Sequence, residues 1–283
     1  MITGGSGFIG KALAGRLVAQ AHTVESGRME LADFDAVREA VKTFRPELVY
    51  HLAATPFNPP GTTGETHLRV NALGTMALLE ALRDLPDTRL VYTGSAAEYG
   101  AGSRLREDQP PRPSTLLGAA KACATLLVET YARRYGMRTV ILRLFTPYGP
   151  GDRPCRLIPY VIRSAAAGGP VRISSGSQQR DFFYIDDLVD ALVAAPSAEL
   201  PNPAVINLCS GEARTVREVV QTTLRLMNAD VPVEVGAVPT RSDEIQECSG
   251  DNSRAAAWLG WTPRTGLEQG LAATIRWHQE HRR

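Results

Sequence analysis

The residues that most clearly suggest chemistry are glycines near the N-terminus. They recur at the spacing GxxGxxG in the run Thr3–Gly10 (TGGSGFIG). Gly4 would let the chain turn sharply after a strand, Gly7 would let a pyrophosphate approach the backbone, and Gly10 would let a helix pack against a sheet. The helix N-terminus would then offer free N–H groups and a favourable dipole to the anion. The predicted dinucleotide-binding residues of this turn are Gly4, Ser6, Gly7, Phe8, Ile9 and Gly10.

A second position bears on which dinucleotide is bound. At the end of the second strand of such a fold, an acidic residue holds a ribose 2′-hydroxyl, whereas an arginine holds a 2′-phosphate. The stretch Val24–Arg28 (VESGR) places Arg28 nearest that position, while Glu25 argues for the opposite choice. The cofactor is therefore predicted to be NADP or NAD, with NADP mildly favoured.

The composition is that of an ordinary globular protein. The chain has 283 residues, 43% of them hydrophobic and 22% charged, with 31 Lys and Arg against 30 Asp and Glu. The net charge of +1 argues against nucleic-acid binding driven by bulk charge. The four cysteines form no CxxC pair and no histidine stands at ligand spacing, so we expect free thiols and no metal. With no long apolar run and no signal peptide, we expect no membrane segment and a cytoplasmic location.

Apolar periodicity predicts alternating helices and strands in the first half of the chain. Helices are expected at Lys11–Gln20, Asp33–Phe44, His67–Leu85 and Thr115–Tyr135, and strands at His22–Glu25, Leu48–Ala54, Arg89–Gly94 and Arg138–Leu144. This alternation is typical of a parallel sheet with helices on both faces. Only Met1 and Ile2 precede the glycine turn, so either the first strand is very short or the natural chain begins upstream.

After Thr146, prolines and glycines become frequent and the expected elements become shorter. Phe182–Ala195 and Val205–Leu208 are expected to return to the main sheet. A further element is expected at Val231–Val235, followed by a terminal helix at Leu267–Gln279.

Motifs spread along the chain carry a family resemblance. They are TGGSGFIG at 3–10, HLAA at 51–54, NALGT at 71–75, TGSAAEYG at 93–100, RLFTPYGPGDRP at 143–154, GSQQRDFFYIDD at 176–187, NLCSG at 207–211 and LGWTP at 259–263. Together they resemble the NAD-dependent epimerase/dehydratase family of extended short-chain dehydrogenases/reductases, which acts on nucleotide sugars. The resemblance implies a Rossmann-type doubly wound parallel sheet with a smaller C-terminal substrate-binding domain. Residues 1–145 would form the first domain, with 180–210 returning to it, and 146–283 mainly the second.

The catalytic set of that family is a Ser or Thr with Tyr and Lys spaced YxxxK. Ser95 and Lys121 match the Ser and Lys positions, but Leu117 stands where the Tyr is expected. In the family, Tyr moves the proton of the sugar oxygen, because a nearby Lys lowers its pKa towards neutrality. Leucine has no proton to give, so the usual acid/base is absent.

Three interpretations of Leu117 remain open. Another group could carry the proton, for which Tyr99, Tyr148, Cys123 and an ordered water are the candidates. Alternatively, the protein binds dinucleotide and sugar nucleotide as a catalytically weak sensor or scaffold. In the third interpretation, Leu117 is an engineered or variant residue.

A further departure from the family concerns the positions directly after Ser95. The 4,6-dehydratases of the family carry an Asp-Glu pair there, whereas this chain has Ala96 and Ala97. The resemblance therefore argues against 4,6-dehydration and leaves 4-keto reduction or 4-epimerisation open.

The resemblance also implies a set of binding residues. Arg180 and Arg241 match arginines that contact the substrate diphosphate, and paired guanidinium donors suit that group. The implied cofactor residues beyond the turn are Arg28, Glu30, Leu31, Leu52, Ala53, Ala54, Asn71 and Lys121. The implied substrate residues are Ser95, Thr146, Arg180 and Arg241.

The similarity of the EYG ending, the NLCSG element and the 241–244 segment to 4-ketoreductases favours one reaction. This is reduction of a 4-keto-6-deoxy sugar nucleotide with NADP or NAD, and 4-epimerisation is the alternative. The resemblance also implies a homodimer formed through the helices at His67–Leu85 and Thr115–Tyr135. No nucleic-acid or membrane partner is expected.

Overall fold

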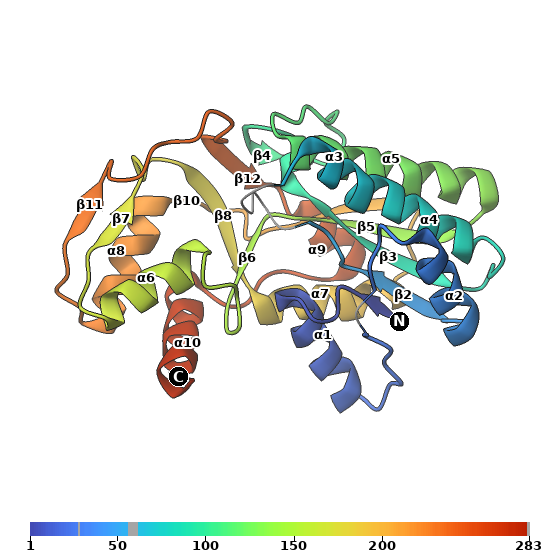
Figure 1. Ribbon diagram of the computed structural model, residues 1–283, viewed down its shortest axis with the longest axis horizontal. Coiled ribbons are helices and arrows are strands. Elements are labelled where there is room, and N and C mark those ends of the chain that lie inside the picture. The colour runs from blue at the N-terminus through green and yellow to red at the C-terminus, as the bar shows by residue number, and fades with distance from the viewer. Residues whose placement is uncertain (28, 56–61, 282–283) are drawn as a thin grey trace.

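The computed structural model describes residues 1–27, 29–55 and 62–281. Figure 1 shows a larger lobe built around parallel strands and, beside it, a smaller lobe formed mainly by the later part of the chain. None of the helices in the described ranges is long and apolar enough to cross a membrane. Within the same ranges, no group of three or more His, Cys, Asp and Glu side chains could hold a metal ion.

The larger lobe contains a five-stranded parallel sheet in the order β1-β2-β3-β5-β9. Its strands are β1 Ile2–Thr3, β2 Leu48–His51, β3 Arg89–Ser95, β5 Arg138–Leu144 and β9 Ala204–Leu208. The inner strands are almost continuously buried, as expected for a parallel sheet covered on both faces. The predicted α/β fold is therefore confirmed, and the segment around Val205 does return to this sheet.

Helices cover the two faces of the sheet (Figure 1). On one face lie α2 Phe34–Phe44, α4 Gly74–Leu82 and α5 Leu116–Tyr135, and on the other lie α1 Phe8–Ala19 and α7 Ile185–Ala194. Successive residues of β3 point to opposite faces: Val91 joins the core beneath α1 and α7, whereas Leu90 and Tyr92 join the core beneath α2, α4 and α5. Each such buried apolar side chain contributes roughly 1.5–3 kcal/mol to the free energy of unfolding.

Two predicted elements of the larger lobe differ from the structure. No strand forms at His22–Glu25, and the contact there is a hydrogen bond of 2.7 Å from the Ile2 N–H to the Glu25 carbonyl. With only two residues, β1 is too short to build a longer ladder. The helix expected from His67 begins earlier, as α3 Gly64–His67, because the Thr63 side chain caps it. It continues through a π-helical turn at Leu68–Leu73 into α4.

The smaller lobe is built on a second sheet in the order β10-β8-β12-β4, with β6 beside β8. The strands are β4 Gly102–Leu105, β6 Thr146–Tyr148, β8 Gln179–Tyr184, β10 Ala213–Thr215 and β12 Glu247–Gly250, with a separate pair of β7 Val171–Ile173 and β11 Val233–Val235. Helices α6 Leu157–Ala166, α8 Val216–Met227 and α10 Leu267–Glu280 pack around them, and α9 Ser253–Leu259 lies near β9. Phe182 thus belongs to this second sheet and not to the main one.

Candidate active site

The glycine-rich turn connects β1 to α1. A Cβ on Gly10 would lie 2.3 Å from the Gly4 carbonyl oxygen, and a Cβ on Gly4, whose φ is +74°, would lie 2.7 Å from the Ala53 nitrogen. Both positions therefore require glycine. The N-terminus of α1, which follows Gly7, has no side-chain cap and no acidic first-turn residue among the described residues. Its free N–H groups suit an anion, so the turn fits a dinucleotide pyrophosphate.

The segment after β2 lies directly against this turn. The Leu52 N–H donates to the Thr3 carbonyl over 3.2 Å, and the Ala53 N–H donates to Thr3 Oγ1 over 3.3 Å. Leu52, Ala53 and Ala54 are half-buried. The structure thus brings three predicted cofactor residues to the carboxyl edge of the sheet, where open α/β sheets bind ligands.

His51, at the end of β2, is enclosed and serves the scaffold. Its Nδ1 lies 2.6 Å from Thr3 Oγ1 and its Nε2 lies 2.9 Å from Thr75 Oγ1. Burial, together with the nearby Lys121 charge, lowers the pKa of His51 to about 3. The ring is therefore neutral at pH 7, and both of its nitrogens are occupied in holding β1, β2 and α4 together.

Lys121 projects from α5 beneath the end of β3. Its Nζ donates to the Thr93 carbonyl over 2.7 Å and lies 3.4 Å from the Tyr92 hydroxyl. The side chain is almost fully buried, and this burial lowers the pKa of Lys121 to about 8. Lys121 therefore contacts β3 at Thr93, two residues before Ser95.

Ser95 ends β3 and is oriented by a buried network. Its N–H donates to Glu98 Oε1 over 2.7 Å, and its Oγ accepts from the Ala97 N–H over 3.1 Å. Glu98 is fully buried and forms an ion pair of 3.0 Å with Arg143. Glu98 thus connects the Ser95 backbone to Arg143, and removal of either partner of the ion pair would leave the other charge buried and unpaired.

Leu117 lies one helical turn before Lys121 in the first turn of α5. Thr115 caps this helix, with its Oγ1 accepting from the Gly118 N–H over 3.0 Å. A Cβ on Gly118 would lie 2.3 Å from the Ala97 carbonyl oxygen, so α5 packs closely on the turn that follows Ser95. The structure therefore brings together Ser95, Leu117 and Lys121.

Neither tyrosine considered as a substitute proton donor is available. The Tyr99 hydroxyl accepts from Arg143 over 2.7 Å and donates to Asn207 over 2.8 Å, and burial raises the pKa of Tyr99 to about 12. The Tyr148 hydroxyl donates to a carbonyl oxygen of α10, and burial raises its pKa as well. Cys123 is exposed on α5, whereas Lys121, two residues before it, is buried.

Asn71, a predicted cofactor residue, holds the segment after β2 in place. It accepts from the Thr55 N–H over 3.0 Å and donates from Nδ2 to Thr55 Oγ1 over 2.8 Å. Thr55 Oγ1 also lies 2.6 Å from Nδ1 of His67. Sequence reasoning missed both Thr55 and His67. The available signal was a histidine one helical turn before Asn71.

The two arginines predicted to contact a diphosphate come together in the smaller lobe. Arg180, in β8, forms an ion pair with Glu244. Arg241 Nη2 lies 3.2 Å from the second oxygen of the same carboxylate. Glu244 therefore links the two guanidinium groups. Thr146 is close by in the fold, because β6 pairs with β8.

The remaining predicted residues lie in other surroundings. Arg28 is outside the described residues. Glu30 is exposed and accepts from the Ala32 N–H over 3.3 Å. The Leu31 side chain is buried in the core and lies against Gly74. Only the backbone of Leu31 is therefore left for the predicted contact with the cofactor.

This fold and site define a nucleotide-binding protein of the Rossmann type, with a glycine turn suited to pyrophosphate and a buried lysine near a strand-end serine. The profile of the NAD dependent epimerase/dehydratase family matches residues 1–209. The chain belongs to that family, as its motifs predicted.

Relatives with known activities are similar over nearly their whole length. The UDP-glucose 4-epimerase of Mycolicibacterium smegmatis is 29% identical, over 97% of this chain and 96% of the relative. The dTDP-glucose 4,6-dehydratase of Neisseria gonorrhoeae is 27% identical, over 100% and 96%. The fold and size are thus shared among enzymes that catalyse different reactions.

Solved structures give the same picture. MoeE5 in complex with UDP-glucuronic acid and NAD is 32% identical with a TM-score of 0.90, covering 99% of this chain and 98% of that one. The Thermus thermophilus UDP-glucose 4-epimerase in complex with NAD is 27% identical with a TM-score of 0.91, at the same coverage.

Gly10→Ala should abolish most dinucleotide binding, because the added Cβ would meet the Gly4 carbonyl oxygen at 2.3 Å and deform the turn. We expect the Kd for NAD, measured by calorimetry, to rise at least about 100-fold, a loss of roughly 2.7 kcal/mol. Gly15→Ala is the matched control, because a Cβ at that position of α1 would meet nothing within 4 Å. Equal affinities of the two variants would contradict the assignment of the turn.

Proposed function

We propose that this protein uses NAD to interconvert the C4 epimers of a UDP-linked sugar. The observation that carries the proposal is the convergence of three features: the glycine turn in which Gly4 and Gly10 leave no room for a Cβ, the buried Lys121 bonded to β3 near Ser95, and the link between Arg180 and Arg241 through Glu244. Relatives solved with NAD and a UDP-sugar support the choice of ligands.

The turn after β3 argues against 4,6-dehydration. Ala96 and Ala97 occupy its first positions, and the one carboxylate that follows them, Glu98, is buried in its ion pair with Arg143. This stretch therefore offers no acid or base for C5 and C6. Chemistry at C4, which needs no carboxylate pair, is what the stretch permits.

The proposal takes NAD, although Arg28 favoured NADP on sequence grounds. Three of the structures solved with NAD are 27% to 33% identical to this chain, and two more are 24% identical. The RMD of Pseudomonas aeruginosa, complexed with NADPH, is 24% identical and supports the fold alone.

When bound, the nicotinamide would supply the oxidant that takes the C4 hydrogen with its electron pair and later returns it. Ser95 would donate a hydrogen bond to the sugar oxygen at C4, because it ends β3 at the carboxyl edge of the sheet. Lys121 would orient the nicotinamide ribose and place a positive charge near that oxygen. Arg180 and Arg241 would hold the diphosphate with bidentate donors.

A second candidate reaction is reduction of a 4-keto-6-deoxy sugar nucleotide. The sequence features that favour it are the EYG ending at 98–100 and the 241–244 segment, which are similar to 4-ketoreductases. The same site would serve, with the cofactor entering in its reduced form.

Purified protein incubated with UDP-glucose or UDP-glucuronic acid and NAD should form the C4 epimer, detected by proton NMR, with no net change in NADH. Stoichiometric oxidation of NAD(P)H by a 4-keto-6-deoxy sugar nucleotide would instead favour the reductase. Tight NAD binding without turnover of either substrate class would contradict both enzymes and support a binding module.

Arg241→Gln should raise KM for the UDP-sugar by about 10- to 100-fold with a smaller effect on kcat, because one diphosphate donor pair is lost. Steady-state kinetics checks this. Arg225→Gln is the control, because it removes an exposed arginine of α8 that pairs with Glu268 of α10. An unchanged KM in Arg241→Gln would remove this arginine from the substrate site.

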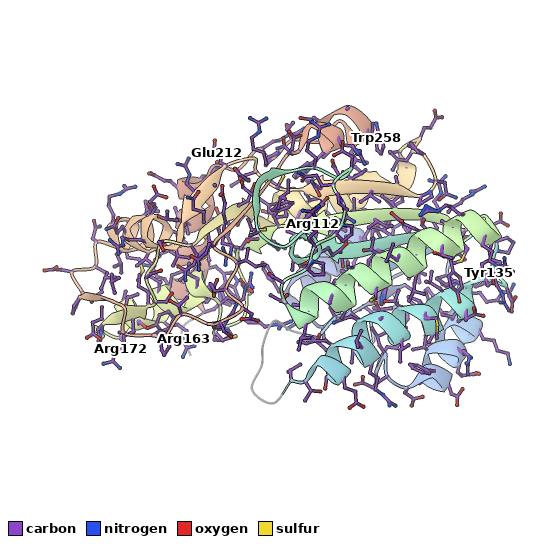
Figure 2. All side chains as sticks on the ribbon, turned by 90° about the horizontal axis from the view of Figure 1, so that it is seen from above. Arg112, Tyr135, Arg163, Arg172, Glu212 and Trp258 are labelled. Carbon is purple, nitrogen blue, oxygen red and sulfur yellow. The ribbon has the colours of Figure 1, made fainter. Side chains whose placement is uncertain are left out.

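We also propose that a second copy of the chain packs on α4 and α5. Figure 2 shows these two helices side by side along the outside of the larger lobe, with Tyr135 at one end of α5. Large apolar side chains on this surface and the turns beside it are exposed, which is typical of an interaction site. They are Leu68, Leu73, Leu116, Leu126 and Tyr135.

Leu126→Arg should convert a dimer to a monomer. The Leu126 side chain is 55% exposed in the single chain and would be buried in the proposed dimer, so an arginine there would bury an unpaired charge. Light scattering after size exclusion measures the mass. Val18→Arg, at an exposed position of α1, should leave the mass unchanged. A wild-type monomer would exclude the proposed dimer.

A further inference from the structure

We propose that Thr55 and His67 form a proton relay that replaces the missing tyrosine, with Thr55 taking the proton of the sugar hydroxyl and His67 accepting the proton of Thr55. This inference rests on the proposed C4 chemistry, and concerns residues that no family motif includes. It starts from Leu117, which cannot move a proton, and from Tyr99 and Tyr148, whose hydroxyls are already engaged.

Thr55 lies beyond the carboxyl end of β2, on the side of the sheet where the ligand is expected. It follows Ala53, which contacts the glycine turn, by two residues, and it is half-buried. Asn71 fixes its position through two hydrogen bonds, one to the backbone and one to the side chain. The hydroxyl of Thr55 is therefore held beside the expected dinucleotide site.

The directions of the two hydrogen bonds between Asn71 and Thr55 follow from the donors present. Because the Thr55 N–H must donate, the Asn71 atom that faces it is the oxygen, and the amide nitrogen faces Thr55 Oγ1. Thr55 Oγ1 thus accepts from Asn71 and lies 2.6 Å from Nδ1 of His67, to which it donates its own proton in the tautomer that the relay requires. One lone pair of the Thr55 hydroxyl remains for a substrate O–H.

His67 is a suitable proton acceptor at the end of this relay. In the tautomer that the relay requires, its Nδ1 carries no proton, and its Nε2 has no hydrogen-bond partner among the described residues. Burial lowers the pKa of His67 below its usual range, which keeps the ring neutral and able to act as a base at pH 7. His51, by contrast, has both ring nitrogens engaged.

Thr55 and His67 also lie close to Leu117, the position at which the family has its tyrosine. His67 ends α3, and a Cβ on Gly64, the first residue of that helix, would lie 3.2 Å from the side chain of Leu116. Leu116 directly precedes Leu117. Figure 1 shows α3 beside the first turn of α5.

The proton and electron changes balance within the proposed reaction. The sugar O–H bond breaks as an O–H bond forms at Thr55 Oγ1, and the original Thr55 proton moves to Nδ1 of His67. Bound NAD would supply the oxidant that accepts the C4 hydrogen with its electron pair, so that the C4 alcohol would become a ketone. Reversal of these steps on the other face of the sugar gives the epimer.

Thr55→Val should lower kcat for epimerisation by at least about 100-fold, because it removes the relay hydroxyl without changing the size of the side chain. Thr55→Ser, which keeps the hydroxyl, should retain most of the activity, and His67→Phe should behave like Thr55→Val. Thr43→Val, at an exposed threonine of α2, is the control and should match the wild type.

Restoring the family's phenol separates catalysis from structure. Leu117→Tyr added to Thr55→Val or to His67→Phe should recover at least about tenfold of the lost activity, because the relay is then bypassed. A purely structural role of Thr55 would not be rescued from position 117, so failure of the rescue would overturn the relay.

A readout independent of turnover is the ring state of His67. Nitrogen NMR at pH 7 of the protein without added ligand should show a hydrogen-bonded, unprotonated Nδ1 that loses its hydrogen bond in Thr55→Val. Calorimetry should show that NAD binds to Thr55→Val with the wild-type affinity. A protonated Nδ1 would overturn the relay.

The relay and the proposed function fail in different ways. If the wild type epimerises a UDP-sugar and Thr55→Val does so equally fast, the relay is wrong and the proposed function stands. If the wild type converts no UDP-sugar although it binds NAD, the proposed function is wrong, and the relay is rejected with it.

Discussion

The site depends on a steric constraint in the first turn of the chain: two glycines leave no room for a β-carbon. Gly10 lies against the carbonyl of Gly4, and Gly4 lies against Ala53 of the segment after β2. Real side chains essentially never approach this closely. Because the glycines permit it, the start of α1, the end of β1 and the end of β2 meet at one point, and the ligand site can form there.

From that point a chain of polar contacts runs through the buried interior. Each member forms a hydrogen bond with a neighbouring polar group that would otherwise be buried without a partner. In order they are Thr3, His51, Thr75, Asn71, Thr55 and His67. The first part ties strands and a helix together. The last two residues, Thr55 and His67, lie beside the proposed substrate site, where a fixed hydroxyl and a neutral imidazole could transfer a proton.

Charge organises the two sides of the site differently. In the larger lobe, Lys121 is enclosed, and burial lowers its pKa to about 8. In the smaller lobe, Arg180 and Arg241 are balanced by the shared carboxylate of Glu244. The Glu244 carboxylate keeps the two guanidinium groups close together and reduces the repulsion between them.

The sequence by itself determined the features that depend on local rules. The strand Arg138–Leu144 and the helix capped by Asp33 were predicted correctly, because periodicity and capping act within a few residues. The glycine turn and the absence of a phenol at position 117 were equally readable. The prediction of a strand at His22–Glu25 was wrong, because its neighbour β1 has only two residues and is too short to pair with it. Only the tertiary structure decided that Tyr99 and Tyr148 are engaged elsewhere, that Glu244 joins two distant arginines, and that Thr55 meets His67. These contacts bring together residues from separate segments, and no local rule of periodicity or capping specifies how such segments pack.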